Sequence, residues 1–442
     1  MGKVKVIWYE LTNSFWFVPI LIILFSIALA SSLILLDRSI DFGSVVYLRQ
    51  ILTESADSAR SVLSTISGAM IGVAGTVFSI TLVALTLASS QFGSRLLKNF
   101  MHERINQVVL GTYISTYVYC LIVLNVVKDN DSEVFIPTIS ILVAIIAAIG
   151  NIILLIVFIH HISMSIQADK VVSDISKSLM INIERIFSEE LEDEDSTPLN
   201  KTKDLKHYLE DYSYSKTLKS SKSGYLQYIH NQSFFEAGKA NDYLIVLHHR
   251  VGGHIVKGEP IITIHSKSEF TEESSINFHN NFVIGNSRTT QQDAEHSINQ
   301  MVEIACRALS PGVNDPFTAI ACIDNLTSTL CYLTRVKFPS RYRFDDEKQL
   351  RYVYRPLTYQ GILDAAFLQI RQFSKGSPAV VIRLMEALIT IHEYSRFKVH
   401  KDAIKEHAQM VLKVAKDSFE ESHDLEDMRK RSKIILGDSD GE

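Results

Sequence analysis

Residues 61–94 read SVLSTISGAMIGVAGTVFSITLVALTLASSQFGS and contain no charged side chain between Arg60 and Arg95. A helix of about 20 apolar residues crosses the hydrocarbon core of a bilayer, which is roughly 30 Å thick. A surface helix of a soluble protein carries charged and polar residues along one face, and this segment has no such charged face. We therefore expect a membrane-spanning helix within residues 61–94.

Three further segments share this lack of charge. They lie between Glu10 and Asp37, between Arg104 and Lys128, and between Glu133 and Asp169. Each is long enough to cross a bilayer. The sequence predicts a four-helix transmembrane domain at residues 1–168, with spans at about 14–36, 62–90, 105–127 and 136–160. The predicted spans hold no Asp, Glu, Lys or Arg, which argues against a proton-coupled transporter that uses an intramembrane carboxylate.

The basic residues near the spans predict how the chain is oriented. Seven of them fall on one side of the predicted membrane: Lys3, Lys5, Arg95, Lys98, Arg104, Lys170 and Lys177. Four fall on the other side: Arg38, Arg49, Arg60 and Lys128. Because Lys and Arg are more frequent in cytoplasmic segments, we expect both termini to be cytoplasmic.

The second span carries a stripe of small and polar residues. Its members recur at steps of three and four and so share one helix face: Gly68, Gly72, Gly75, Ser79, Val83, Thr86 and Ser90. One interpretation is close helix packing, since Gly68 and Gly72 form a small-xxx-small contact. The other is a pore lining, because hydroxyls and carbonyls can line an ion path without charged side chains. Both can hold in an oligomer.

Other polar residues lie in the third and fourth spans. Tyr113, Thr116 and Tyr117 share a face of the third, and Asn151 is central in the fourth. Polar groups in hydrocarbon need partners, so we expect them to point into the bundle. The pair His160–His161 ends the fourth span, where a pH-sensing or ligand-contacting role competes with simple hydration at the interface.

The part after the spans is charged and of mixed type. Residues 169–222 read as a helical extension and an acidic, flexible linker, with six acidic residues among positions 189–195. Short β-branched runs separated by Gly and Pro predict a small β-rich module at 223–286. Helical periodicity predicts an α-helical domain at 287–425, before a polar tail at 426–442. The expected fold class is an integral membrane α-helical protein with a cytoplasmic β module and helical bundle.

Two polar clusters of the helical part are candidate ligand or interface sites. The first, at 286–293, includes Arg288, Gln292 and Asp293, and the second, around 307–316, includes Arg307, Asn314 and Asp315. Helix capping and turn formation are the competing explanation, since Ser-Pro-Gly ends a helix and Asp-Pro starts one. Neither cluster pairs a nucleophile with a base or forms a phosphate-binding glycine loop, so we assign no catalytic residue and do not favour an enzyme.

Composition excludes several other classes. The net charge of −5 gives no broad basic surface, so a nucleic-acid partner is not expected. The four cysteines lack C-x-x-C spacing and read as reduced, packed thiols. The histidines at 248, 249, 254 and 265 lack metal-ligand spacing. We therefore predict no metal and no cofactor.

Several motifs together resemble one bacterial family. They are Ser14–Pro19, Ala59–Ile66, Val77–Leu85, Ala88–Phe92, Arg95–Phe100, Phe158–Ile162, Arg288-Thr289 with Gln292-Asp293, and Arg307–Gly312 with Asn314–Pro316. This set is similar to the predicted membrane proteins grouped as domain of unknown function 2254. The resemblance implies a multi-pass protein of the bacterial inner membrane with a cytoplasmic C-terminal region, and it supplies no activity. One departure is Gly93-Ser94, where the family pattern has Ser-Pro.

The function that these features favour is an oligomeric channel, or channel-like permeation pathway, gated or assembled by the cytoplasmic region. The alternative is a membrane-anchored scaffold or sensor whose cytoplasmic domain binds a ligand or a protein. The expected partners are the lipid bilayer and further copies of the same chain. The residues do not identify an ion or a small ligand.

Overall fold

The computed structural model describes residues 14–39, 55–93, 104–130, 133–191, 205–270, 281–290 and 292–437. It divides into two compact units, Met1–Lys170 and Val171–Glu442, called here the N-terminal and the C-terminal unit. Several features predicted above lie outside the described residues, namely the charges at 3, 5, 49, 95 and 98, most of the acidic linker, and the end of the polar tail.

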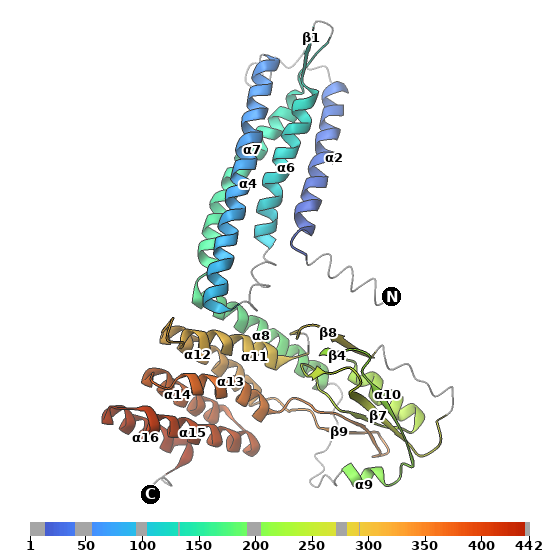
Figure 1. The fold of residues 1–442 in the computed structure, drawn as a ribbon, viewed down its shortest axis with the longest axis vertical. Coiled ribbons are helices and arrows are strands. Elements are labelled where there is room, and N and C mark those ends of the chain that lie inside the picture. The colour runs from blue at the N-terminus through green and yellow to red at the C-terminus, as the bar shows by residue number, and fades with distance from the viewer. Residues whose placement is uncertain are drawn as a thin grey trace. The chain divides into compact units, whose positions relative to one another are not determined.

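The N-terminal unit is a bundle of four long helices (Figure 1). They are α2 (Phe17–Ser39), α4 (Ala56–Phe92), α6 (Arg104–Val126) and α7 (Thr138–Ser165). All four are long and apolar enough to cross a membrane, which confirms the predicted fold class for this part. A short antiparallel pair, β1 (Lys128–Asn130) and β2 (Glu133–Phe135), joins α6 to α7.

Helices α2 and α6 approach each other closely at a glycine. A Cβ added to Gly111 would lie 2.9 Å from Cδ1 of Ile22 and 3.0 Å from Cα of Pro19. Nearby, the Ser26 hydroxyl donates a hydrogen bond of 2.8 Å to the backbone carbonyl of Ser115. Small residues at helix contacts in membranes let backbones approach and form such bonds. Gly111 therefore has a packing role inside the subunit.

A carboxylate at the end of α2 caps the start of α7. Asp37 is buried and accepts hydrogen bonds from the backbone amides of Ile139 and Ser140, at 3.0 and 3.1 Å, and from the Ser140 hydroxyl at 2.6 Å. The residue before α7 is Pro137, which offers no side-chain cap. The first amides of a helix lack partners within it and favour a nearby negative charge. The carboxylate of Asp37 therefore provides the hydrogen-bond acceptors that the side chain of Pro137 cannot provide.

The C-terminal unit begins along α8 (Ala168–Leu191) and contains two sheets. The five-stranded sheet has the order β3 (Tyr214–Lys219), β7 (Pro260–Ser266), β5 (Leu244–Leu247), β10 (Leu350–Val353), β9 (Tyr342–Phe344). The three-stranded sheet has the order β6 (His254–Ile255), β4 (Gly224–Ile229), β8 (Phe282–Gly285). Helices α9 (Leu205–Leu209) and α10 (Asn231–Asn241) complete this part.

The larger sheet draws strands from beyond the predicted module at 223–286. Strand β3 precedes that module, while β9 and β10 come from within the predicted helical domain, β10 pairing with β5 in parallel. The short strand β10 has an arginine at its second position. Arg351 is only 6% exposed, and its guanidinium pairs with the carboxylates of Asp242 and Asp345. A buried arginine that pairs with one nearby and one distant carboxylate interrupts the apolar pattern by which a strand is recognised in a sequence.

The remaining helices pack together as a bundle (Figure 1). They are α11 (Ala294–Ala308), α12 (Pro316–Leu333), α13 (Tyr359–Phe373), α14 (Pro378–Tyr394), α15 (Lys398–Ser418) and α16 (Ser422–Leu436). Helix α16 covers most of what the sequence presents as a polar tail, and it buries Met428 and Ile435. Small sheets followed by helices confirm the predicted mixed character of this region.

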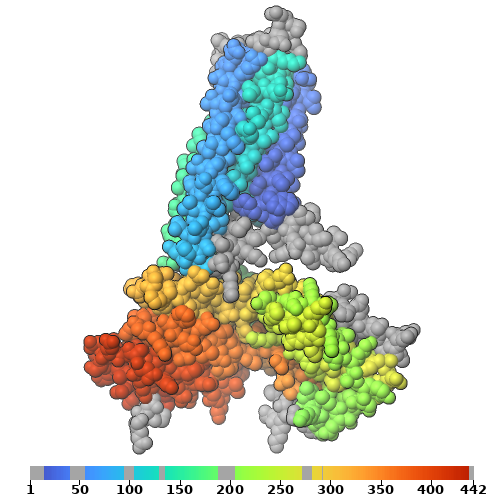
Figure 2. Space-filling view, in the orientation of Figure 1, coloured from blue at the N-terminus to red at the C-terminus, as the bar shows by residue number. Residues whose placement is uncertain are grey.

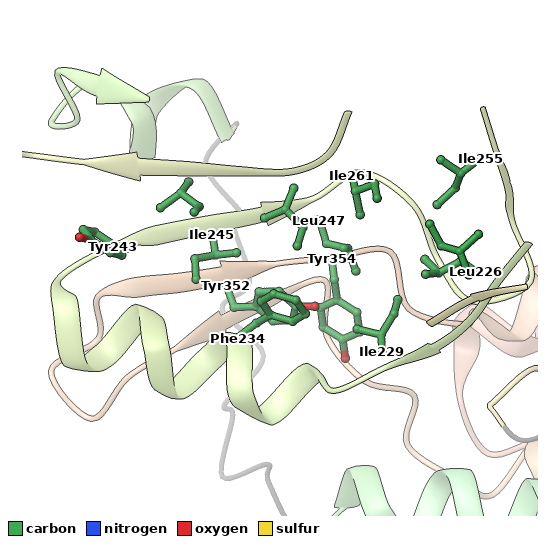
Figure 3. Close-up of a cluster of buried hydrophobic side chains, with 13 residues drawn as sticks. Leu226, Ile229, Phe234, Tyr243, Ile245, Leu247, Ile255, Ile261, Tyr352 and Tyr354 are labelled. Carbon is green, nitrogen blue, oxygen red and sulfur yellow. The ribbon is translucent and has the colours of Figure 1, made fainter. Parts of the chain in front are cut away.

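Aromatic rings form the centre of the sheet region. Phe234 of α10 stacks on Tyr352 of β10 with ring centroids 6.0 Å apart, and Tyr352 stacks on Tyr354 at 5.2 Å (Figure 3). Offset ring pairs of this kind stabilise a core beyond the apolar area that they bury. The stack fixes α10 against the sheet and places Tyr354 at the edge of the core.

Candidate functional site

The small and polar stripe of α4 faces away from the other three helices. All seven of its members are exposed on the single subunit: Gly68, Gly72, Gly75, Ser79, Val83, Thr86 and Ser90. A Cβ added to any of the three glycines would meet no atom within 4 Å. The buried face of α4 consists of other residues, among them Leu63, Met70 and Val77. Figure 2 shows α4, in light blue, on the outer surface of this unit.

The hydroxyls of the stripe bond to their own helix. Ser79 donates to the carbonyl of Gly75 at 2.9 Å, and Thr86 donates to the carbonyl of Leu82 at the same distance. Such bonds satisfy the donor without a neighbouring helix. The acceptor lone pairs of each hydroxyl oxygen remain directed away from that bond. The stripe is therefore stable on an exposed surface and still offers polar atoms to whatever contacts it.

A second group of polar residues meets inside the bundle. The Tyr113 hydroxyl donates to the backbone carbonyl of Asn151 at 2.6 Å. The Asn151 side-chain amide donates to the Thr116 hydroxyl at 2.8 Å and to the sulfur of Met70 at 3.3 Å. Tyr117, predicted on the same face, is half-buried. Three helices, α4, α6 and α7, thus share one network in which each polar group has a partner, as hydrocarbon surroundings require.

The two histidines near the end of α7 differ in environment. His160 is exposed, whereas His161 is half-buried with its Nδ1 3.4 Å from the Ser165 hydroxyl. The two rings therefore do not form one joint site within the subunit.

The first polar cluster of the C-terminal unit is organised by an ion pair. Arg288 donates two hydrogen bonds to the carboxylate of Asp293, at 2.7 and 2.8 Å, and Asp293 is 2% exposed. The same carboxylate accepts from the amide of His296 and caps α11. Gly252, with a φ of +86°, lies directly against Asp293, and a side chain there would collide with the carboxylate. Arg288 and Asp293 therefore have a structural role at the start of α11.

Gln292 belongs to the same cluster but bonds to the backbone of a strand and not to the ion pair. Its side-chain amide accepts from the backbone amide of Ile229 at 3.0 Å and donates to the Ile229 carbonyl at 3.1 Å. In this way it pairs with the end of β4 as a neighbouring strand would. Gln292 also lies in the wall of a pocket of the C-terminal unit.

The second polar cluster forms a turn and a helix cap. Asn314 has a φ of 51°, and its amide donates to the carbonyl of Ser310 at 2.9 Å. Asp315 accepts from the amide of Thr318 at 3.1 Å and caps α12. Arg307 lies 3.7 Å from the Glu303 carboxylate, one turn earlier on α11. The cluster thus has local partners at each of these three residues, and it does not join the first cluster through any bond among the residues described.

Two features have no local signal in the sequence. Asp37 caps a helix that begins about one hundred residues later, so only the folded bundle pairs them. The pocket contains Arg250, Arg343 and Arg355, which come from three separated segments of the C-terminal unit. Each is an ordinary isolated arginine in the sequence, and a search for motifs cannot group them.

A family comparison covers most of the chain. The profile described as "Predicted membrane protein (DUF2254)" matches residues 12–390. The chain belongs to this family. The matched residues include all four long helices and every strand that the structure describes in the C-terminal unit, so the family profile extends over both units.

Relatives of this DUF2254 protein occur in mycobacteria. It is 27% identical over 435 residues to a protein of Mycobacterium tuberculosis (strain ATCC 25618 / H37Rv) and, equally, to one of Mycobacterium bovis, both named as uncharacterized proteins. The alignment covers 96% of this chain and 80% of each relative. No solved structure matches the chain.

Proposed function

We propose that this DUF2254 protein assembles from several copies in the membrane and forms a permeation path beside α4. The proposal rests on the outward stripe of small and polar residues on α4. An added Cβ at its glycines would meet no other part of the subunit that the structure describes; the stripe consists of Gly68, Gly72, Gly75, Ser79 and Thr86. In the assembly, the stripe of each subunit contacts another copy or faces the path.

The energetic argument concerns the glycines. A glycine inside a helix lowers helix stability by about 1 kcal/mol relative to alanine. Contact with lipid chains does not compensate this cost, because lipid packs equally well against larger apolar residues. Close approach of another helix does compensate it through dispersion contacts and hydrogen bonds between helices. Three glycines on one exposed face of α4 therefore support helix contact between subunits.

The argument for permeation concerns the hydroxyls. The oxygens of Ser79 and Thr86 donate to their own helix and keep acceptor capacity on the side that faces outward. Oxygen acceptors can replace part of the hydration shell of a cation without a charged side chain. A path lined in this way would favour cations or small neutral solutes over anions.

The distribution of basic residues supports an inner-membrane protein with both termini in the cytoplasm. The C-terminal unit would then be cytoplasmic, where it can hold the assembly together or gate it. Its helical bundle and sheets are large enough to form contacts between copies outside the membrane.

The test combines oligomer order with conductance. The full chain is purified in a mild detergent, its mass is measured by native mass spectrometry, and current is recorded in planar bilayers. We expect an oligomer and a current, and we expect Gly72→Leu and Ser79→Leu to weaken both. Gly150→Leu is the matched control, since Gly150 of α7 is also exposed and has no atom within 4 Å of an added Cβ.

The possible results separate the functions. If Gly72→Leu and Gly150→Leu give the same oligomer order and the same current, the proposed role of the stripe is contradicted. A stable monomer without current would favour the second function, a membrane-anchored sensor or scaffold. The arginine-containing pocket of the C-terminal unit is the observation that supports this second function.

A further inference from the structure

The C-terminal unit contains a pocket of about 240 Å³. Its wall comes from the end of β4, the first turn of α10, the loop after β5, strand β9 and the segment that follows β10. Three arginines, Arg250, Arg343 and Arg355, line it, and its described wall contains no Asp or Glu. A concave site with converging guanidinium groups and no acidic wall residue attracts anions.

Two of the arginines are held in position by other side chains. The guanidinium of Arg250 donates two hydrogen bonds to the carboxylate of Glu295, at 2.6 and 2.5 Å. Arg343 donates to the side-chain carbonyl of Gln232 at 2.9 Å, and its guanidinium lies over the ring of Phe235, 4.3 Å from the centroid. Such contacts restrict the rotamers of both side chains, so that less entropy is lost when a ligand binds.

The third arginine has no carboxylate partner among the described residues. Arg355 is exposed and makes no ion pair with any residue that the structure describes. Because the structure describes no carboxylate beside Arg355, this side chain adds positive charge to the pocket. Among the described residues Arg355 also makes no hydrogen bond that holds the fold together, so its charge is available to a ligand.

The first turn of α10 adds to the positive potential. His230, Asn231 and Gln232 line the pocket, and His230 is the N-cap of the helix. The N-terminus of a helix presents unpaired amides and the positive end of the helix dipole, which favours phosphate and similar anions. The helix and the arginines therefore act on the same space.

The rest of the wall is apolar or aromatic. Tyr354, at the edge of the aromatic stack, lies here together with Leu247 and Pro356 (Figure 3 shows Tyr354 and Leu247). The volume is below the range of roughly 300–1,000 Å³ that is typical of sites for drug-sized ligands. A small ligand with one strongly charged group and an apolar or ring-shaped remainder fits this composition.

We propose that this pocket binds a small phosphomonoester, with Arg343 and Arg355 on the phosphate and the remainder of the ligand against Tyr354 and Leu247. A phosphate dianion can accept bonds from two guanidinium forks at once, whereas a carboxylate is satisfied by one. The phosphate can belong to a soluble metabolite or to the terminal phosphate of a lipid headgroup. The site depends on neither the assembly nor the conduction proposed above.

Binding is tested by isothermal titration calorimetry on the full chain in detergent, with phenyl phosphate as the probe. We expect saturable binding that weakens about tenfold in Arg355→Gln, since a hydrogen-bonded charge is lost. Arg396→Gln is the matched control, an exposed arginine two residues after α14 that is not in the pocket wall. No binding, or equal weakening by both substitutions, would overturn the proposal.

Two further probes define the ligand class. Benzoate carries a carboxylate on the same ring and should bind at least about tenfold more weakly, and equal affinity would overturn the assignment to phosphate. Dihexanoyl phosphatidic acid below its micellar concentration tests the lipid source. Tighter binding than phenyl phosphate, sensitive to Arg355→Gln, assigns the site to a lipid headgroup, and weaker binding assigns it to a soluble phosphomonoester. The oligomer and current measurements are unaffected by either result.

Discussion

The interior of the helix bundle and the outer face of α4 contain the same kinds of residue in different surroundings. Inside, Gly111 lets α2 and α6 approach each other, and Asn151 bonds to two other helices. Outside, Gly72 meets no atom within 4 Å, and Ser79 bonds only within its own helix among the described contacts. Inside the bundle, small and polar residues make close helix contacts within the subunit. On the outer face of α4 they have no such contact among the described residues, and there we propose contact with another copy.

Under the proposed assembly, the residues that stabilise the fold of the subunit and the residues that contact other copies lie on different faces of the helices. Substitutions inside the bundle should lower the stability of the subunit. Substitutions on the stripe should leave that stability intact and change what the subunit contacts. Unfolding by sodium dodecyl sulfate at low protein concentration reports on the first property, and native mass on the second.

The largest effect is expected at Gly111. Gly111→Leu would force a side chain against Ile22 and the backbone of Pro19, and overpacking of this kind lowers the free energy of unfolding by about 3 kcal/mol. Gly72→Leu should leave the unfolding midpoint unchanged or raise it slightly, because leucine has the higher helix propensity. Equal destabilisation by both substitutions would contradict the distinction between the two faces.

The next effect is expected at Asp37. Asp37→Ala removes three hydrogen bonds and a negative charge from the start of α7, which should lower the free energy of unfolding by about 2 kcal/mol. Asp37→Asn keeps an acceptor and should lower it by roughly half as much. Thermal unfolding in detergent, followed by circular dichroism, measures both. If the alanine variant unfolds at the same temperature as the wild type, the Asp37 cap does not stabilise the folded protein.

A smaller effect is expected in the interior network. Asn151→Leu removes the donors to Thr116 and Met70 while keeping a similar side-chain volume. Hydrogen bonds between helices in membranes contribute modestly, so we expect a loss of about 1 kcal/mol. The matched variant Thr116→Val removes the acceptor of the same bond, and the double variant should lose less than the sum of the two single losses. Additive losses would argue against this bond.

The smallest effect on the subunit is expected on the stripe itself. Thr86→Val removes an exposed hydroxyl whose described bond is to its own helix, so the free energy of unfolding should change by less than about 0.5 kcal/mol. The same substitution should reduce current if the hydroxyl faces a permeation path. If Thr86→Val lowers the unfolding midpoint as much as Asn151→Leu does, then the Thr86 hydroxyl makes a stabilising contact that is absent from the described subunit.

In the C-terminal unit, the sequence and the fold agree where signals are local. Residues 223–286 are predicted to form a β-rich module, and strand β4 (Gly224–Ile229) lies within them. Asp315-Pro316 predicts a helix start, and α12 begins there. These features depend on neighbouring residues, because β-branched runs and helix caps act over a few positions.

The distant pairings could not be predicted in the same way. Strand β10 is stabilised around Arg351 by carboxylates from residues 242 and 345, and it joins β5 from about a hundred positions away. The arginine pocket likewise collects residues that share no motif. Asp345 lies six positions before Arg351, but no short stretch of sequence shows that Asp242, more than a hundred positions earlier, will also pair with it.

The sequence by itself determined that this protein has four membrane-spanning stretches, because the absence of charge over more than twenty residues is a local property that lipid selects directly. It also determined that the small and polar residues of the stripe between positions 68 and 90 share one helix face, because the spacing of residues along the sequence fixes which of them share a face. The tertiary structure alone decided that this face points outward and that Gly111 and Asp37 act inside. Spacing specifies a face of a helix, whereas the packing of all four helices decides which face is buried.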